Sequence, residues 1–260
     1  MMSSSTKKIA VISGAAHGIG KSAALLLAEQ VSTLILIDMD SKGLDRIQAD
    51  LNEKPGAAAV LYVYTADVTQ EAEVRQVFAE IRNICPQIDI LINAVGGSSS
   101  SGEAFVLTEN MSWQQWQAML SLNLSSAFLC CREVIPLMKK KGYGRIVNFS
   151  SIARHGHRDK VSAAYAASKA GIDGFTRKLA REAAPFGITC NAVAPGITLT
   201  KRIEEKFWNT RSKAEQNALL ESIPLRRLSS PEEQAQVAVF LASDAASYLT
   251  GQIIEVSGGL

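Results

Sequence analysis

The 260-residue chain has little of what would indicate metal chemistry, disulfides or nucleic-acid binding. Its four cysteines, Cys85, Cys130, Cys131 and Cys190, form no CxxC pair and no metal-ligand spacing with the three histidines. We therefore predict buried, reduced thiols and no metal. Its 27 Lys and Arg residues against 25 Asp and Glu give a formal net charge of +2. No basic run is long enough to indicate a nucleic-acid partner.

The sequence also lacks segments that would direct it into a membrane. Its first residues are polar and contain no signal-peptide core. No apolar stretch approaches the roughly 20 residues that a membrane span requires. We expect a cytoplasmic protein without membrane contacts. No linker or repeat divides the chain, so residues 7–260 are expected to form one domain after a flexible tail at residues 1–6.

What is present is an alternation of short apolar runs with longer amphipathic ones. Apolar strands separated by helices predict an α/β fold, a Rossmann-type, doubly wound parallel sheet of about seven strands flanked by helices. The expected strands are Lys8–Ser13, Thr33–Asp38, Val60–Ala66, Ile88–Asn93, Arg145–Ser151, Thr189–Ala194 and Gln252–Val256. The expected helices are Gly18–Gln30, Lys42–Asn52, Gln70–Ile84, Met111–Lys140, Ala163–Ala184 and Pro231–Ala242.

A glycine-rich turn, Ser13 to Gly20, joins the first expected strand to the first helix. Gly14 permits the tight turn, Gly18 permits close approach of a ligand, and Gly20 permits close packing of helix on strand. The free N–H groups and partial positive charge of the helix N-terminus suit a pyrophosphate. Because the turn follows strand one, it predicts a nucleotide site that includes His17 and Ile19.

Asp38 ends the second strand, about 20 residues beyond the glycines, where a carboxylate can accept hydrogen bonds from an adenosine ribose. The same carboxylate repels a 2′-phosphate, and His17 stands where a basic residue would favour one. These residues predict NAD, with NADP disfavoured. The alternative is that Asp38 only caps a turn with Asp40 and Ser41.

Tyr165 and Lys169 are four residues apart and share one face of a helix. A free phenol has a pKa of about 10, and a nearby cation lowers that pKa toward the range of a useful base. The pair alone is common, so its meaning depends on context. Otherwise Tyr165 is a packed core residue.

In combination, these features resemble the short-chain dehydrogenase/reductase family over essentially the whole chain, from Lys8 to Gly259. The resemblance rests on the glycine turn, Asp38, Asp67-Val68-Thr69, Asn93-Ala94-Val95-Gly96, Asn123, Gly144 to Ser151, Tyr165 with Lys169, Pro195-Gly196 and Val256 to Gly259. It implies a nicotinamide-dependent oxidoreductase that needs no metal.

The resemblance also implies roles for individual residues. Tyr165 is the implied general acid/base, Lys169 binds the nicotinamide ribose and lowers the phenol pKa, and Ser151 bonds the substrate oxygen. Asn123 holds a relay water through its effect on the long helix. The implied cofactor contacts are Gly14, His17, Gly18, Ile19, Gly20, Asp38, Asp67, Val68, Asn93, Gly96, Tyr165, Lys169, Pro195, Gly196, Ile197, Thr198 and Thr200.

Three positions depart from the family pattern. Ser13 replaces a threonine but keeps the hydroxyl. Ala94 and Val95 replace an asparagine and an alanine, which puts fine contacts near the adenosine ribose in doubt. Ser151 precedes Tyr165 by 14 residues, one more than the commonest spacing, so Ser150 remains the alternative.

Two segments are expected to frame the substrate, 97–107 and 197–225. In the second, Phe207 and Trp208 indicate an apolar underside of a helical lid, or else of a helix packed permanently on the core. Arg154 and His157 lie in a basic run before Tyr165. They are candidates to bind an anionic substrate group, and the alternative is a solvated loop or a subunit contact.

We therefore expect an NAD(H)-dependent oxidoreductase that interconverts a secondary alcohol, sugar, polyol or cyclic diol and its ketone. One alternative is a ketoreductase like the 3-oxoacyl-carrier-protein reductases, which commonly use NADP. A nicotinamide-binding sensor or scaffold is the non-enzyme alternative. The resemblance implies a homotetramer built through the helices near Met111–Lys140 and Ala163–Ala184.

Overall fold

The computed structural model describes residues 8–53, 60–98, 105–156 and 161–260, so the expected tail at residues 1–6 lies outside the described residues. A single sheet of seven parallel strands runs through the molecule in the order β3-β2-β1-β4-β5-β6-β7. The strands are β1 (Ile9–Ser13), β2 (Thr33–Asp38), β3 (Val60–Thr65), β4 (Ile90–Asn93), β5 (Gly144–Phe149), β6 (Ile188–Pro195) and β7 (Ile253–Val256). This confirms the predicted fold class, in one domain.

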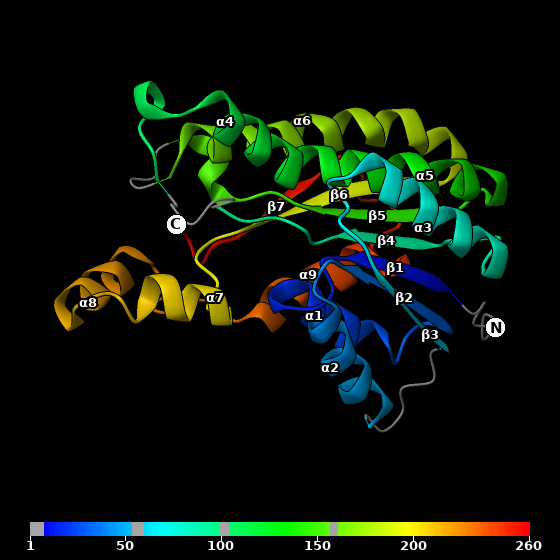
Figure 1. The fold of residues 1–260 in the computed structure, drawn as a ribbon, viewed down its shortest axis with the longest axis horizontal. Helices are drawn as coiled ribbons and strands as arrows, with labels where there is room; N and C mark the ends of the chain where they lie inside the picture. Colours follow the sequence, from blue (N-terminus) through cyan, green and yellow to red (C-terminus); the bar gives the residue numbers. More distant parts are fainter. Residues whose placement is uncertain (1–7, 54–59, 99–104, 157–160) are drawn as a thin grey trace.

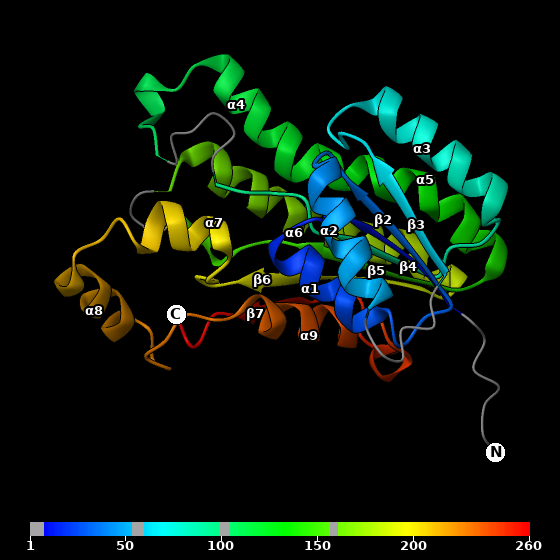
Figure 2. The same cartoon turned by 60° about the horizontal axis from the view of Figure 1, so that its bottom comes forward.

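Helices cover both faces of the sheet (Figure 1). The helices α1 (Gly18–Leu27), α2 (Ser41–Asn52) and α9 (Pro231–Leu241) cover one face, and α3 (Glu71–Ile84), α5 (Ser126–Lys141) and α6 (Ala163–Ala183) cover the other. Figure 2 shows the remaining helices, α4 (Trp113–Leu120), α7 (Lys201–Ile203) and α8 (Lys213–Ser222), toward the end of the molecule where the strands finish.

Successive side chains of a β-strand point to opposite faces of the sheet, so a strand of apolar residues makes both faces apolar. In β2, Leu34 and Leu36 pack into the core cluster beneath α1, while Ile35 and Ile37 pack into the opposite cluster. All four side chains are fully buried. Fully burying one such side chain stabilises the fold by about 1.5–3 kcal/mol. Because its side chains point to both faces in alternation, a strand that is apolar throughout is expected inside a sheet that helices cover on both faces.

The expected long helix Met111–Lys140 is two α-helical segments joined by a π-helical turn, Ser121–Ser125. Its first turn is fixed by a capping box of Ser112 and Gln115. The wider turn contains Asn123, whose Nδ2 donates to the carbonyl oxygen of Met119 at 3.1 Å. The π-helical turn therefore places an amide side chain in the interior of the helix pair.

The same helix, Trp113–Lys141, corrects the expectation that no segment could span a membrane. By length and composition it is apolar enough to do so. Its Cys130, Cys131, Val134 and Met138 are instead fully buried against the sheet. The fold thus accounts for its apolar character as that of a core helix.

Candidate active site

The glycine turn lies where the sheet order reverses, between β1 and β4. Ser13 and Asn93 end those strands opposite each other, and such a switch point opens a crevice for a ligand. A Cβ on Gly14 would lie 2.7 Å from the amide nitrogen of Val95, and one on Gly20 would lie 2.0 Å from the carbonyl oxygen of Gly14. The backbone therefore comes close enough to form a phosphate cradle only because these residues are glycine.

Asp38 is held at the rim of this cradle by two backbone N–H groups. Its carboxylate accepts from Ala16 and from Asp40, both at 3.0 Å. The bond from Asp40 shows that Asp38 does cap a turn, as the alternative expected, while Asp40 is the N-cap of α2. Each carboxylate oxygen can accept a second hydrogen bond, so Asp38 can still bind ribose hydroxyls. His17 is turned toward Asp40, with 2.6 Å between Nε2 and Oδ2.

The side chains of Asn93 and Val68, two of the expected adenosine contacts, are buried and make contacts within the protein. Asn93 is 3 % exposed and donates from Nδ2 to Oδ1 of Asn148 at 2.8 Å, within a buried polar chain beneath the site. Val68 is buried in the core. At these two positions only the backbone remains for a cofactor. Asp67 keeps an accessible carboxylate, whose Oδ1 accepts from the amide of Thr69 at 2.9 Å.

The loop after β6 returns to the glycine turn. A Cβ on Gly18 would lie 3.1 Å from Cγ2 of Thr200, the N-cap of α7. Gly196 packs on Ser257, and the hydroxyl of Thr198 accepts from Ser229 at 3.0 Å. The segment Pro195–Thr200, with Ile197 half-buried, therefore lies beside the turn, as a site for one extended cofactor would require.

The two candidate serines face different partners. Ser151 shares a side-chain hydrogen bond with Tyr165. Ser150 is buried and donates to Oδ1 of Asp173 at 2.6 Å. The structure therefore brings Ser151, and not Ser150, to the phenol.

Tyr165 and Lys169 share a face of α6, with 5.9 Å between Nζ and the ring centroid. Burial raises the pKa of the Tyr165 hydroxyl above its ordinary value, while Ser151 and Arg202 oppose the rise. The phenol pKa is therefore raised, and not lowered as expected, because burial outweighs the groups that lower it. Burial lowers the pKa of Lys169 to about 8, Asp173 opposes this, and Nζ donates to the carbonyl of Phe149 at 2.7 Å.

Two neighbouring glycines open the space in which the polar groups meet. A Cβ on Gly96 would lie 2.7 Å from Oδ1 of Asn123 and 3.0 Å from Nζ of Lys169. Asn123 in turn accepts from the amide of Gly97 at 3.0 Å and donates to its carbonyl oxygen at 3.1 Å. Asn123 is thereby fixed beside Lys169 and bonds the backbone of Gly97, the first residue of the expected substrate segment 97–107, of which residues 99–104 lie outside the described residues.

Arg154 does not face a substrate anion, contrary to the expectation. Its guanidinium bonds Asp173 at 2.7 Å, Glu255 at 2.5 Å and the carbonyl oxygen of Ser151 at 3.1 Å. Its side chain is 9 % exposed. Arg154 therefore ties the Ser151 loop to α6 and β7. His157 lies outside the described residues.

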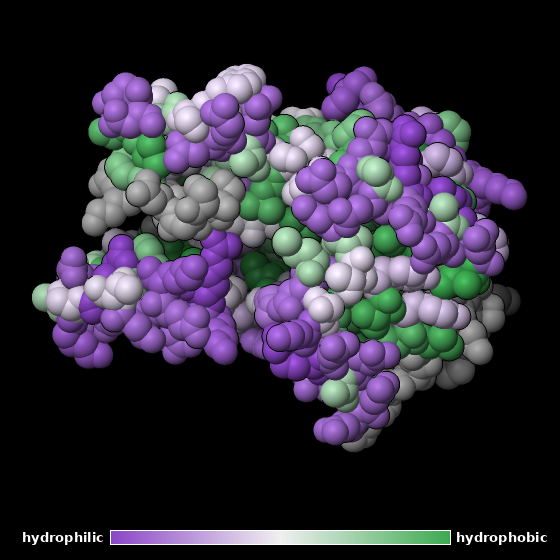
Figure 3. Space-filling view, in the orientation of Figure 1, coloured by the Kyte–Doolittle hydropathy of each residue, from purple (hydrophilic) through white to green (hydrophobic). Residues whose placement is uncertain are grey.

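Phe207 and Trp208 lie half-buried in a π-helical turn, Glu204–Trp208, between α7 and α8. The guanidinium of Arg211 stacks on Phe207 at 3.5 Å from the ring centroid. None of the residues of α8 is buried, so this helix lies on the surface of the molecule. Figure 3 shows a hollow with an apolar floor between the region of α7 and the region of α1.

Asp173, Glu255, Arg202 and Gly97 were not singled out from the sequence. Their partners lie far along the chain or on another element, and nothing in local spacing indicates such pairings. Of these four, only Gly97 could have been noticed in the sequence, because it directly follows Gly96. Among the described ranges, no group of three or more His, Cys, Asp or Glu side chains could hold a metal ion.

Comparison with known proteins shows similarity along the whole length. Residues 14–260 match the family model described as enoyl-(acyl carrier protein) reductase. The chain is 37% identical over 254 residues to 3-oxoacyl-(acyl-carrier-protein) reductase FabG of Thermotoga maritima, covering 97% of each. It is also 37% identical over 254 residues to NAD-dependent glycerol dehydrogenase of Listeria innocua, covering 98% of this chain and 94% of that protein. A solved structure of 3-oxoacyl-(acyl-carrier protein) reductase with bound NAD from Brucella melitensis has a TM-score of 0.85 at 32% identity, covering 98% of this chain and 92% of the other.

Proposed function

The chain belongs to the short-chain dehydrogenase/reductase family of oxidoreductases, and we propose that it interconverts a secondary alcohol and its ketone with NAD(H). The observation that carries this proposal is the meeting of Ser151, Tyr165 and Lys169 beside Asn123. Those groups lie next to a glycine cradle at the sheet's switch point. A proton-transfer centre beside a nucleotide cradle suits removal or addition of hydrogen at a carbon that bears oxygen.

The cofactor is a nicotinamide nucleotide, and we propose NAD. Gly14, Gly18 and Gly20 would hold its pyrophosphate, Asp38 its adenosine ribose and Lys169 its nicotinamide ribose. When bound, the nicotinamide supplies the hydride acceptor or donor. Two features support NAD over NADP: Asp38 is anchored at the ribose end, and Asp40 engages both His17 and Arg46. A 2′-phosphate would meet negative charge there.

Tyr165 acts as the acid in ketone reduction and as the base in alcohol oxidation. Its pKa, raised by burial, favours the protonated phenol, which is ready to donate to a developing alkoxide. The hydroxyl of Ser151 stabilises the same oxygen. Asn123 fixes the Gly97 backbone and lies beside Lys169, so we assign it to the proton path behind the phenol.

The test is a screen of secondary alcohols and ketones with both nicotinamide cofactors. We expect kcat/KM with NAD to exceed that with NADP by more than about tenfold, which is 1.4 kcal/mol of discrimination. Asp38→Asn should shrink that ratio, and Asp45→Asn on the exposed face of α2 should leave it unchanged. A preference for NADP would overturn the assignment of NAD. Binding of NAD without turnover of any substrate would favour a sensor.

A second candidate is a ketoreductase that acts on 3-oxoacyl thioesters. Its support is the 37% identity to the reductase of Thermotoga maritima over 97% of both chains. An acetoacetyl thioester assayed beside the simple ketones distinguishes the two. Preference for the thioester by more than tenfold in kcat/KM would favour this second reading.

A further inference from the structure

Arg154 is joined to the carbonyl group of Ser151 by two separate hydrogen bonds. Its backbone N–H donates to that oxygen at 3.1 Å, and so does Nη1 of its guanidinium, also at 3.1 Å. Ser151 is the N-cap of the short 3-10 turn Ile152–His155. Its hydroxyl oxygen accepts from the amide of Ala153 at 3.1 Å. The hydrogen of that hydroxyl is therefore left to donate to another oxygen.

The other nitrogens of the Arg154 guanidinium are held by carboxylates on two different elements. Nε bonds Oδ2 of Asp173 on α6 at 2.7 Å, and Nη2 bonds Oε1 of Glu255 on β7 at 2.5 Å. A guanidinium is planar, so bonds in three directions fix its plane as well as its position. The side chain is 9 % exposed, and these bonds are strengthened because little water surrounds them. The guanidinium thus fixes the carbonyl of Ser151 relative to α6 and β7.

Asp173 connects this anchor to the part of α6 that carries the proton-transfer groups. It lies one helical turn after Lys169, and its Oδ1 accepts from the hydroxyl of Ser150 at 2.6 Å. Its negative charge also opposes the lowering of the Lys169 pKa by burial. Tyr165 lies one turn before Lys169 on the same face. The turn that follows β5 is thereby held against the face of α6 that carries the phenol.

We propose that Arg154 is a positioning residue for catalysis, and that it holds the hydroxyl of Ser151 where it bonds both Tyr165 and the substrate oxygen. This inference rests on the proposed interconversion of alcohol and ketone. The backbone bond from Arg154 lies within the 3-10 turn, whereas the guanidinium ties that turn to two other elements. Placement matters because a displacement of about 1 Å at an active site can lower the rate by about 10²-fold.

The test is a double-mutant cycle between Arg154→Met and Ser151→Ala, measured as kcat for the reduction of a ketone by NADH. Arg154→Met alone should lower kcat about tenfold and change KM less than about threefold, because the hydroxyl of Ser151 acts mainly in the transition state. In the Ser151→Ala background the same substitution should lower kcat less than about twofold, because the group that Arg154 positions is no longer there.

Arg145→Met is the matched control, because Arg145 lies at the opposite end of the same region, at the start of β5. Its side chain is 6 % exposed, close to the 9 % of Arg154, and it pairs with Asp244 at 3.5 Å. This substitution should lower the urea midpoint of unfolding but change kcat less than about twofold. Arg154→Lys keeps a charge beside Asp173 but loses the fork of paired N–H donors, so it should lower kcat only about threefold.

The pattern of losses decides between positioning and a general structural role. Equal losses of kcat from Arg154→Met in the wild-type and Ser151→Ala backgrounds would overturn the inference, and so would an unchanged kcat in Arg154→Met. If Arg154→Met does not fold, Arg154→Lys takes its place in the cycle. A loss confined to the background that contains Ser151 then supports the inference, and an equal loss in both, or no loss, overturns it.

Amide hydrogen exchange separates this inference from the proposed reaction, because it needs no turnover. The amide of Ala153 donates to Oγ of Ser151, so its exchange rate reports whether the hydroxyl oxygen is in place. Arg154→Met should speed this exchange at least about tenfold, and Arg145→Met should leave it unchanged. If the wild type reduces no ketone, the proposed function fails, yet faster exchange at Ala153 still supports the placement of Ser151 by Arg154. An unchanged exchange rate in Arg154→Met would overturn that placement.

Discussion

Ser150 and Ser151 are neighbours in the chain whose substitutions should have different effects. Ser151→Ala removes the hydroxyl that bonds Tyr165 and should lower kcat by about 100-fold or more. Ser150→Ala removes the hydroxyl donor from Oδ1 of Asp173, which keeps its ion pair with Arg154, and should cost about 2 kcal/mol of stability, with kcat falling less than about tenfold. Steady-state kinetics and urea unfolding of both variants measure this. A larger loss of kcat in Ser150→Ala would reverse the assignment.

At this scale the sequence predicted residue identities better than residue orientations. Gly14, Gly18 and Gly20 could be predicted because each has a steric requirement that only glycine meets. The orientation of Arg154 could not, because its partners Asp173 and Glu255 are 19 and 101 residues away. The phenol pKa was predicted in the wrong direction because spacing on a helix gives proximity of charge but not burial.

The long helix from α4 to α5 contains a local feature, a π-helical turn, that the hydrophobic repeat of the sequence did not predict. A hydrophobic repeat near 3.6 residues predicted one helix from Met111 to Lys140, and the π-helical turn Ser121–Ser125 leaves that repeat almost unchanged. The turn nevertheless determines that Asn123 faces Gly97. Element order and strand bounds were predictable, to within about two residues, because each β-strand is mostly apolar and is separated from the next by a longer amphipathic segment.

The segment from α7 to α8 is the element expected to respond to ligand. The residues of α8 are held by a capping box at Ser212 and Glu215 but none is buried, so its backbone amides should exchange quickly with solvent. Binding of NADH and a ketone should slow exchange of the amides in α8. The amides of β2, already buried on both faces, are the internal control. Strong protection of α8 without ligand would contradict the lid assignment.

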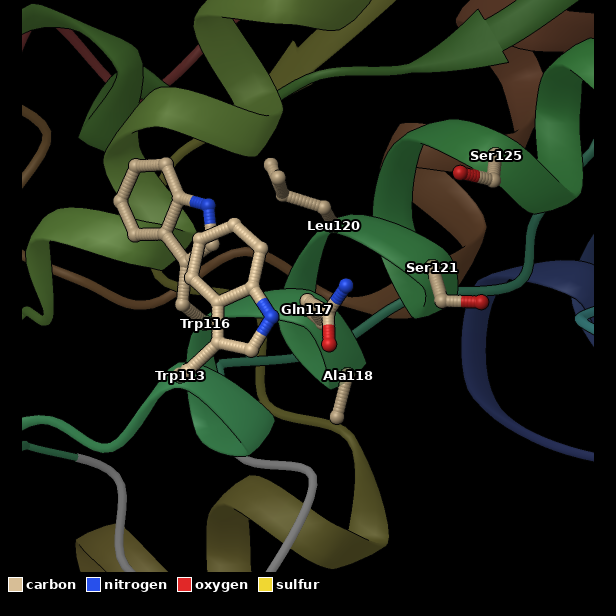
Figure 4. Close-up of a pocket in the computed structure, with 7 residues that line it drawn as sticks. All are labelled: Trp113, Trp116, Gln117, Ala118, Leu120, Ser121 and Ser125. Atoms are coloured by element: carbon tan, nitrogen blue, oxygen red, sulfur yellow. The ribbon is translucent and has the colours of Figure 1, made fainter.

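At the scale of the whole molecule, apolar surface remains uncovered on the helices opposite α1. On α4 and the π-helical turn, a pocket of about 540 Å³ is lined by Trp113, Trp116, Gln117, Ala118, Leu120, Ser121 and Ser125 (Figure 4). Trp113 is 64% exposed, and Phe128 of α5 is 45% exposed beside Phe175 of α6. Large exposed apolar side chains on one face are typical of an interface.

We propose that these helices join copies of the chain into a homotetramer. Light scattering after size exclusion should give four times the mass of one chain. Phe128→Glu should shift the mass downward, because a carboxylate would be buried without a partner at the interface. Phe240→Glu on α9, an equally exposed position, is the control. A monomeric wild-type protein would refute the assembly.

The central claim is that Tyr165 carries the proton in a nicotinamide-linked interconversion of alcohol and ketone. The most direct measurement is the rate of NADH oxidation by a ketone substrate in the wild type, Tyr165→Phe and Tyr248→Phe, the last being a fully exposed tyrosine. Tyr165→Phe should lower kcat by about 10²–10⁴-fold while NADH still binds, and Tyr248→Phe should match the wild type. Full activity in Tyr165→Phe would contradict the account.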